Sequence, residues 1–189
     1  MKFNPKKPFF SVVIICYNSE KTINQCLHSV IHQKFNSFEV ICVNDGSTDD
    51  TLKIITKCSN SLPNLKIINQ PNSGRGFSRN VGTLNAKGQF VVFLDSDDVI
   101  AKDYLDKGYY YLNITNADLM IFDMKYSDQI VDNSDQEVIV DCKEYIKLKI
   151  DTFQRSQSVC STFISKEIFS RGIEFPNVRG FEDVFILHK

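Results

Sequence analysis

The sequence predicts an α/β fold in which a mostly parallel sheet carries helices on both faces. Four apolar runs alternate with segments of helical periodicity between residues 10 and 94. These runs contain few polar residues, which is typical of strands buried on both faces. The last run, Phe90 to Leu94, ends directly in Asp95, Asp97 and Asp98. Ligands bind beyond the carboxyl ends of parallel strands, so this acidic stretch marks the expected functional edge.

Each element of the first half follows from a local pattern. The predicted strands are residues 10–16, 38–44, 65–69 and 90–94. The helices between them are indicated by apolar residues at helical spacing, namely Ile23, Cys26, Leu27, Val30 and Ile31, then Leu52, Ile55 and Cys58, then Phe77, Val81 and Leu84. Ser19 is expected to cap the first helix, residues 45–50 to cap the second, and Gly88 to stop the third. Repeats of this length form right-handed crossovers and therefore a parallel sheet.

The second half is less regular. A helix is predicted over residues 104–112 and a strand over residues 117–126. Further predictions are an exposed loop at 127–136, an edge strand at 137–141, a helix at 143–153 and a strand near 159–165. The sequence contains no internal repeat and no linker, so we expect residues 1–189 to form a single domain.

Composition excludes several classes of protein. The 22 basic and 23 acidic side chains give a net charge of −1, and no basic cluster marks a nucleic-acid-binding face. The six cysteines form no C-x-x-C pair and indicate buried thiols in a reducing cytosol, not disulfides or a zinc site. No apolar run approaches the ~20 residues of a membrane helix. The basic and apolar start lacks a signal-peptide cleavage site, so it is assigned to the first strand and the protein to the cytoplasm.

The aspartates after the fourth strand are expected to bind a metal ion. Two unit charges ~4 Å apart repel by ~4 kcal/mol at an effective dielectric near 20, and a hard divalent cation turns that repulsion into attraction. The stretch has too few ligands to wrap Ca²⁺ by itself, so Mg²⁺ or Mn²⁺ is expected. The alternative is a run of turn and helix-cap residues, which accounts for one or two of the aspartates.

Four loops are expected to meet at the same edge of the sheet, namely residues 17–20, 45–50, 70–79 and 95–98. Two of these loops are acidic, and the third carries Arg75 and Arg79. This mixture suits a metal–diphosphate ligand, because carboxylates hold the cation while arginines face the phosphates.

The same residues resemble a known family, the family-2 glycosyltransferases. The match is carried, in order and spacing, by SVVIICYNSEKTI, VNDGSTDDT, SGRGFSRNVG, GQFVVFLDSDD and FEDVF. It covers almost the whole chain and is densest over residues 10–100. Cys16 departs from the pattern, because many relatives carry proline there. The resemblance implies the GT-A fold, which is a Rossmann-like, mostly parallel sheet, together with nucleotide-sugar donors and an inverting reaction.

The resemblance also implies roles for the donor-side residues. Tyr17 would lie against the nucleobase, and Asp45 would accept a hydrogen bond from it. Arg79 would help to hold the nucleotide. Asp95 would face the ribose and the metal, Asp97 would be the main metal ligand, and Ser96 between them is grouped with the donor-binding residues.

On the acceptor side, Glu182 and Asp183 match the family's Glu-Asp pair, in which the aspartate is the base. Glu20 faces the donor edge, although a first-turn helix acid explains it equally well. Helix capping is the alternative for Asp45, and it is the preferred interpretation for Asp49. First-turn acids favoured by the helix dipole are the alternative for the Glu-Asp pair.

The sequence therefore predicts a metal-dependent, inverting glycosyltransferase of bacterial surface-polysaccharide synthesis, with a UDP-sugar favoured as donor. The acceptor is expected to be a glycan or lipid-linked glycan, which implies peripheral contact with the inner membrane face. Residues 10–100 would bind the donor, and residues 101–189 would form an acceptor-side half, expected to be truncated at its C-terminus. The alternatives are a non-catalytic nucleotide-sugar-binding module and a sugar-phosphate nucleotidyltransferase. The latter needs a glycine-rich basic loop where this chain has Tyr17 to Glu20.

Overall fold

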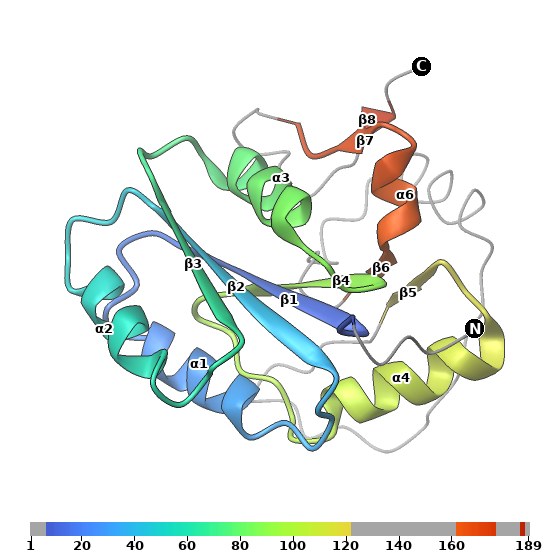
Figure 1. Ribbon diagram of the computed structural model, residues 1–189. Coiled ribbons are helices and arrows are strands. Elements are labelled where there is room, and N and C mark those ends of the chain that lie inside the picture. The colour runs from blue at the N-terminus through green and yellow to red at the C-terminus, as the bar shows by residue number, and fades with distance from the viewer. Residues whose placement is uncertain (1–6, 122–161, 177–185, 188–189) are drawn as a thin grey trace, which may run out of the picture.

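The structure is a computed structural model that describes residues 7–121, 162–176 and 186–187. In these residues a six-stranded sheet has the order β3-β2-β1-β4-β6-β5, and β7 and β8 form a separate two-stranded sheet (Figure 1). The strands are β1 Phe10–Cys16, β2 Phe38–Asp45, β3 Leu65–Gln70, β4 Phe90–Asp95, β5 Leu119–Ile121, β6 Thr162–Ser165, β7 Ile173–Glu174 and β8 Ile186–Leu187. The helices are α1 Ile23–Ile31, α2 Thr51–Cys58, α3 Arg75–Asn85, α4 Tyr104–Thr115 and α6 Lys166–Ser170.

The main sheet is parallel at its centre and antiparallel at one side. β1 pairs in parallel with both β2 and β4, and β2 pairs in parallel with β3. β6 runs antiparallel to β4 and to β5. In the register, Ile15 lies opposite Asp95, and Asp45 lies opposite Gln70. The polar ends of β2, β3 and β4 therefore lie at one edge, as the sequence predicts.

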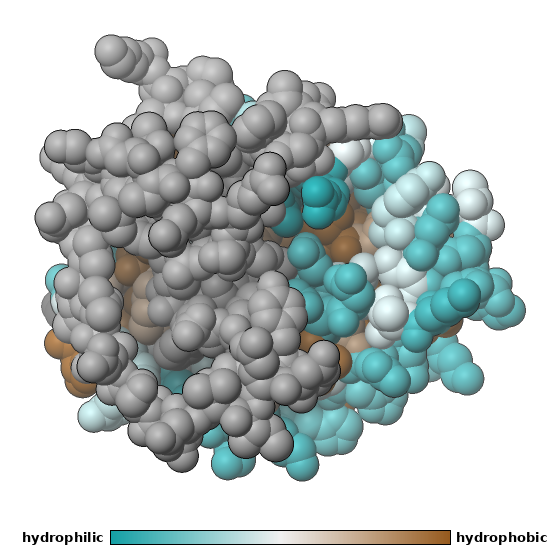
Figure 2. Space-filling view, turned by 180° about the vertical axis from the view of Figure 1, so that it is seen from behind, coloured by the Kyte–Doolittle hydropathy of each residue, from teal (hydrophilic) through white to brown (hydrophobic). Residues whose placement is uncertain are grey.

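Two hydrophobic cores cover the two faces of the sheet. α1, α2 and α4 lie on one face, and α3 and α6 lie on the other (Figure 1). Every residue of β1 is buried, because side chains on both sides of this strand enter a core. Seen from behind, the described part of the surface is mostly hydrophilic (Figure 2).

α3 buries a face that its apolar spacing does not mark. Phe77 and Leu84 are 43% and 83% exposed, whereas the buried residues are Gly76, Ser78, Arg79, Gly82 and Thr83. A Cβ atom at Gly82 would lie 2.3 Å from Cγ1 of Val13 in β1. Apart from Arg79, the helix therefore packs on the sheet through small residues, and this close approach brings Arg79 to the sheet edge.

The prediction that Ser19 caps the first helix is wrong. α1 has Thr22 as its N-cap residue, and that side chain makes no capping hydrogen bond. The carbonyl of Ser19 accepts hydrogen bonds from the backbone N–H groups of Thr22 and Ile23. This arrangement leaves the Ser19 hydroxyl directed across the sheet edge. The third helix also ends earlier than predicted, at Asn85.

The predicted helix at 104–112 is confirmed as α4, which continues to Thr115 and ends at Asn116 in the left-handed conformation with φ 51°. β5 lies within the predicted strand 117–126, and β6 lies within 159–165. The loop, strand and helix predicted over 127–153 lie outside the described residues.

Cys16, Cys26 and Cys42 are buried free thiols and Cys58 is a half-buried one, as expected, while the other two cysteines lie outside the described residues. Within the described ranges, no helix is both long enough and apolar enough to cross a membrane.

Candidate functional site

Three carboxylates converge where β4 ends. Asp95, Asp97 and Asp98 each offer an oxygen, and these oxygens all lie within 4.8 Å of one another. Asp97 is exposed, and the other two are half-buried. The N–H of Asp98 donates to the carbonyl of Asp95 at 3.0 Å, which makes a tight turn that brings the side chains together. We call residues 95–98 the acidic turn.

The acidic turn is held by two residues of the first crossover, β1–α1. The hydroxyls of Ser19 and Ser96 lie 2.7 Å apart and share a hydrogen bond. The thiol of Cys26 on α1 donates to the carbonyl of Asp95 at 3.5 Å. Burial, and then the neighbouring Cys16 and the three carboxylates, raise the pKa of Cys26, so it stays a thiol and keeps its donor hydrogen.

Arg79 supplies the buried positive charge beside the acidic turn. Its side chain is 1% exposed, and Nη2 lies 3.5 Å from Oδ1 of Asp95. The guanidinium also lies over the ring of Phe175, with Cζ 5.5 Å from the ring centre. Arg79 therefore contacts Asp95 directly, whereas Arg75, on the first turn of α3, is exposed.

The acidic turn fits a divalent cation. Its ligands would be hard carboxylate oxygens, the type that Mg²⁺ and Mn²⁺ prefer. One cation between oxygens less than 4.8 Å apart would offset a repulsion that a single arginine, 3.5 Å from one of the three carboxylates, offsets only in part. Asp97 and Asp95 are thus brought together as predicted, with Ser96 between them.

Asp45 lies at the same edge and already accepts three hydrogen bonds from the protein. It is 2% exposed, and its Oδ1 accepts hydrogen bonds from Nε2 of Gln70 at 2.8 Å and from the N–H of Ser73 at 2.8 Å. Oδ2 accepts the N–H of Gly74 at 2.9 Å. The helix-cap alternative for Asp45 is wrong, because this carboxylate fixes the loop between β3 and α3.

Glu20 and Asp49 join the β1–α1 loop to the β2–α2 loop. The carboxylate of Glu20 accepts the N–H of Asp50 at 3.1 Å, and that of Asp49 accepts the N–H of Glu20 at 3.1 Å. Asp49 also accepts from the N–H and hydroxyl of Thr51, the first residue of α2, although the N-cap residue of this helix is Asp50, whose side chain makes no capping hydrogen bond. Desolvation by itself would raise the pKa of Asp49, but these hydrogen bonds outweigh that effect, so the pKa is lowered.

Tyr17 is exposed at the tip of this edge, with 51% of its surface accessible. The next residue, Asn18, has a positive φ of 49°. Its side-chain oxygen accepts the N–H of Thr48 at 2.9 Å, and its N–H donates to the hydroxyl of Ser47 at 3.0 Å. These contacts hold the strained residue in place and present the tyrosine ring to solvent.

Glu182 and Asp183 lie outside the described residues, but both ends of their segment are placed. β7 pairs with β8, with Glu174 opposite Ile186. The amide of Asn80 on α3 exchanges two hydrogen bonds of 2.9 Å with the backbone of Phe175. The chain on either side of the Glu-Asp pair is therefore anchored to the helix that carries Arg79.

Sequence reasoning missed several residues that build this site. Ser19, Cys26, Asn80 and Phe175 act through partners between 69 and 95 positions away, or by contact with Arg79. No local pattern marks such contacts. The one available signal was Asn80 itself, a polar residue directly after the arginine singled out for donor binding.

Comparison with known sequences identifies the protein family that this chain matches. Residues 11–171 match the family described as Glycosyl transferase family 2. The poly(ribitol-phosphate) beta-N-acetylglucosaminyltransferase TarS of Staphylococcus aureus is 42% identical over 120 residues, which are 61% of this chain and 21% of TarS. Glycosyltransferase GlyG of Streptococcus pneumoniae is 27% identical over 192 residues, 95% of this chain and 64% of GlyG. The matched residues therefore span about a fifth of the length of TarS.

Solved structures agree with this placement. The crystal structure of S. aureus TarS 1-349 in complex with UDP-GlcNAc superposes with a TM-score of 0.76 at 33% identity, over 92% of this chain and 50% of that one. The mannosyltransferase PcManGT from Pyrobaculum calidifontis shares the fold, with a TM-score of 0.70 at 19% identity, over 95% of this chain and 51% of that one. The sheet and its flanking helices are those of the GT-A fold, and the chain belongs to glycosyl transferase family 2.

Proposed function

We propose that this chain transfers a sugar from a nucleoside diphosphate donor to a hydroxyl group of a glycan, with inversion at the anomeric carbon and with Mg²⁺ or Mn²⁺ at the acidic turn. The observation that carries the proposal is the convergence of Asp95, Asp97 and Asp98 within 4.8 Å at the carboxyl edge of a parallel sheet. The buried Arg79 beside them adds a positive charge at the same edge.

A UDP-sugar is the proposed donor. Support comes from TarS 1-349, which was crystallised with UDP-GlcNAc and with UDP and is 33–34% identical to this chain. Tyr17 presents an exposed ring that can stack on a nucleobase. Asp45 is the proposed acceptor for a base N–H group. Its oxygens already receive three hydrogen bonds, and a carboxylate has about four lone-pair sites, so one remains.

The residues of the acidic turn have distinct parts in the proposed chemistry. A bound divalent cation would stabilise the charge that grows on the diphosphate as it leaves. Asp97, the exposed member, is the proposed main ligand. Asp95 would be shared between the cation and Arg79, which holds its carboxylate from the protein side. Ser96 would orient the turn through its bond to Ser19 and face the donor.

Asp183 is the proposed base, with Glu182 beside it. Inverting transfer needs a carboxylate on the acceptor side to take the proton of the attacking hydroxyl. In the sequence, Asp183 precedes Ile186 of β8 by three residues. β7, the partner of β8, continues into Phe175, which contacts Arg79. These anchors support a place for Asp183 near the donor.

The proposed acceptor is a surface glycan, carried on lipid, which would bring the protein to the inner face of the membrane. Support comes from the relatives, which include poly(ribitol-phosphate) transferases and a chondroitin synthase. The nucleotidyltransferase alternative lacks support, because the Tyr17 to Glu20 loop offers neither glycine nor arginine to a triphosphate.

The test follows UDP release by the full chain from a panel of UDP-sugars, with and without Mn²⁺ and an oligosaccharide acceptor. We expect Mn²⁺-dependent release that rises with acceptor. Asp183→Asn should lower turnover by about 10²- to 10⁴-fold while donor binding persists. Asp97→Asn should lose Mn²⁺-dependent donor binding. Asp118→Asn, an exposed carboxylate after α4, is the matched control and should leave both unchanged.

The proposal fails if Asp183→Asn turns over as fast as the wild type while Asp97→Asn still abolishes donor binding. That pattern would identify a non-catalytic nucleotide-sugar-binding module. Formation of a UDP-sugar from a sugar phosphate and UTP would instead identify a nucleotidyltransferase.

A further inference from the structure

A second set of potential metal ligands lies at the C-terminal end of α1, where His28 is in the last turn and His32 is the C-cap residue. His28 and His32 are one helical turn apart, and both are exposed. They line a surface groove of about 410 Å³ between α1 and the loop that follows β4. The groove is completed by Gln25, Ser29, Val99, Ile100 and Lys102.

A backbone contact selects one tautomer of the neutral His32 ring. Nδ1 of His32 lies 2.7 Å from the carbonyl oxygen of His28. A carbonyl can only accept, so Nδ1 carries the hydrogen and donates it. In the neutral ring, Nε2 then holds a lone pair directed away from the helix. Metal-binding histidines are commonly oriented in this way, with one ring nitrogen bonded to a carbonyl and the other bound to the metal.

The two rings are spaced for one shared ion. Their centres are 5.9 Å apart and their planes differ by 19°. Two imidazole nitrogens bound to one tetrahedral Zn²⁺ at about 2.05 Å place the ring centres about 5 Å apart. Because the rings are stacked, binding one ion requires both side chains to rotate until their nitrogens face a common point and the ring centres lie about 1 Å closer. Both side chains are exposed, so other rotamers are open to them.

The floor of the groove is held in place by the protein. The hydroxyl of Ser29 donates to the carbonyl of Cys26 at 2.7 Å and accepts the N–H of Ile100 at 3.2 Å. The backbone of Lys102 accepts the N–H of Lys34 just after α1. The two imidazoles therefore border a fixed concave surface with space for metal-bound water.

We propose that His28 and His32 form a metal site that takes one borderline transition-metal ion, Zn²⁺, Ni²⁺ or Cu²⁺, with water completing its coordination. Imidazole nitrogen favours these ions over Mg²⁺ and Mn²⁺, which prefer the oxygens of the acidic turn. The two sites thus select different classes of cation. The proposal does not depend on the proposed transferase activity.

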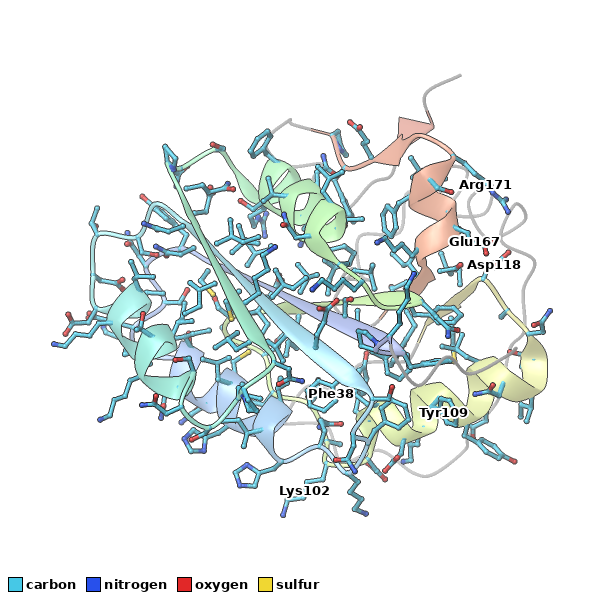
Figure 3. The ribbon with its side chains drawn as sticks, in the orientation of Figure 1. Phe38, Lys102, Tyr109, Asp118, Glu167 and Arg171 are labelled. Carbon is cyan, nitrogen blue, oxygen red and sulfur yellow. The ribbon has the colours of Figure 1, made fainter. Side chains whose placement is uncertain are left out.

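Lys102 also lines the groove, and its positive charge opposes the binding of a cation there. Figure 3 shows this side chain extending outward from the loop before α4. It is exposed, so it can turn to solvent, where salt screens its repulsion. Lys102→Ala should therefore strengthen binding of the ion, and Lys102→Glu should strengthen it further.

The test titrates the untagged full chain with NiCl₂ and with ZnCl₂ by calorimetry in a non-chelating buffer near neutral pH. One equivalent should bind. His28→Ala and His32→Ala should each weaken binding by about 100-fold, because either change turns a chelate into a single contact. The electron paramagnetic resonance spectrum of the Cu²⁺ form should show coupling to two nitrogens in the wild type and to one in either variant.

His188→Ala is the matched control, since it removes the chain's third histidine and should change nothing. Asp97→Asn should retain the Ni²⁺ site in full. The proposal is overturned if the double variant of His28 and His32 binds Ni²⁺ as tightly as the wild type. It is equally overturned if Cys58→Ser, which removes the partly exposed thiol of α2, abolishes binding while both histidines are present.

Discussion

Asp45 and the acidic turn lie at the same edge of the same sheet, yet their carboxylates are in opposite situations. Asp45 is 2% exposed and accepts three hydrogen bonds from the loop between β3 and α3. The turn places Asp95, Asp97 and Asp98 within 4.8 Å of one another, with Arg79 at 3.5 Å from Asp95. Asp45 is stabilised by the protein alone, whereas the turn gains most from an added cation.

This difference follows from what each carboxylate meets. The backbone N–H groups of Ser73 and Gly74 point at Asp45 because Gly74, with φ 90°, turns the chain toward it just before α3. The acidic turn is fixed mainly through its backbone and Ser96, so its carboxylates stay directed at one another. A carboxylate at the edge of a sheet is therefore not evidence of a metal site until its hydrogen-bond partners are known.

The largest expected effect is that of Asp97→Asn. Turnover with Mn²⁺ should fall by about 10³-fold, which corresponds to ~4 kcal/mol of barrier. The unfolding midpoint in metal-free buffer should not fall, because the change removes repulsion. Steady-state UDP release and thermal unfolding of the same sample test both statements. If Asp97→Asn instead lost stability in metal-free buffer, the carboxylates of the acidic turn would be stabilised by protein contacts alone, as Asp45 is.

Unlike Asp97→Asn, Asp45→Ala should lower the free energy of unfolding, and added metal should not restore it. Two backbone N–H groups and the Gln70 amide would lose their acceptor, at a cost of about 3 kcal/mol in the free energy of unfolding. Asp45→Asn keeps one acceptor oxygen and should cost less. Urea unfolding with and without Mn²⁺ measures both. If Mn²⁺ restored the free energy of unfolding of Asp45→Ala in full, the two regions would not differ in their dependence on metal.

Ser19→Ala sharpens the comparison by loosening the acidic turn without changing its charge. Loss of the hydrogen bond to Ser96 should raise the Mn²⁺ concentration for half-maximal activity about fivefold, equivalent to ~1 kcal/mol. Turnover at saturating Mn²⁺ should stay near that of the wild type. Ser59→Ala removes an exposed hydroxyl at the end of α2 and is the control. An equal loss of turnover at all Mn²⁺ concentrations would contradict this positioning role.

The smallest expected effect concerns Asp49 and acid. Its pKa is lowered from the ordinary value of 3.8 by hydrogen bonds that exist only in the folded state. Its contribution to stability is therefore full above that value and is lost as pH falls through the lower folded pKa. The difference in urea midpoint between wild type and Asp49→Asn should be largest near neutral pH and should shrink as the pH falls below 3.8. A difference that grows on acidification would reverse the sign expected here.

The sequence by itself determined the strands of the sheet, the helices between them and the acidic turn. Their signals are local: buried parallel strands are uninterrupted apolar runs, and the three aspartates are adjacent to one of them. Four of the five family motifs lie at the ends of these strands, so the fold and the edge where the donor is proposed to bind could both be predicted. Where the signal was periodicity alone, as in α3, the helix was predicted but its buried face was not.

Only the tertiary structure decided how each side chain is used. Ser19 contacts Ser96 across 77 positions, and Asn80 contacts Phe175 across 95. The three protein partners of Asp45 became known only when the end of β3 and the loop after it were placed against this carboxylate. The physical reason is that hydrogen bonding and burial depend on groups brought together by the sheet register and the crossovers. No short stretch of sequence contains both partners of such a contact.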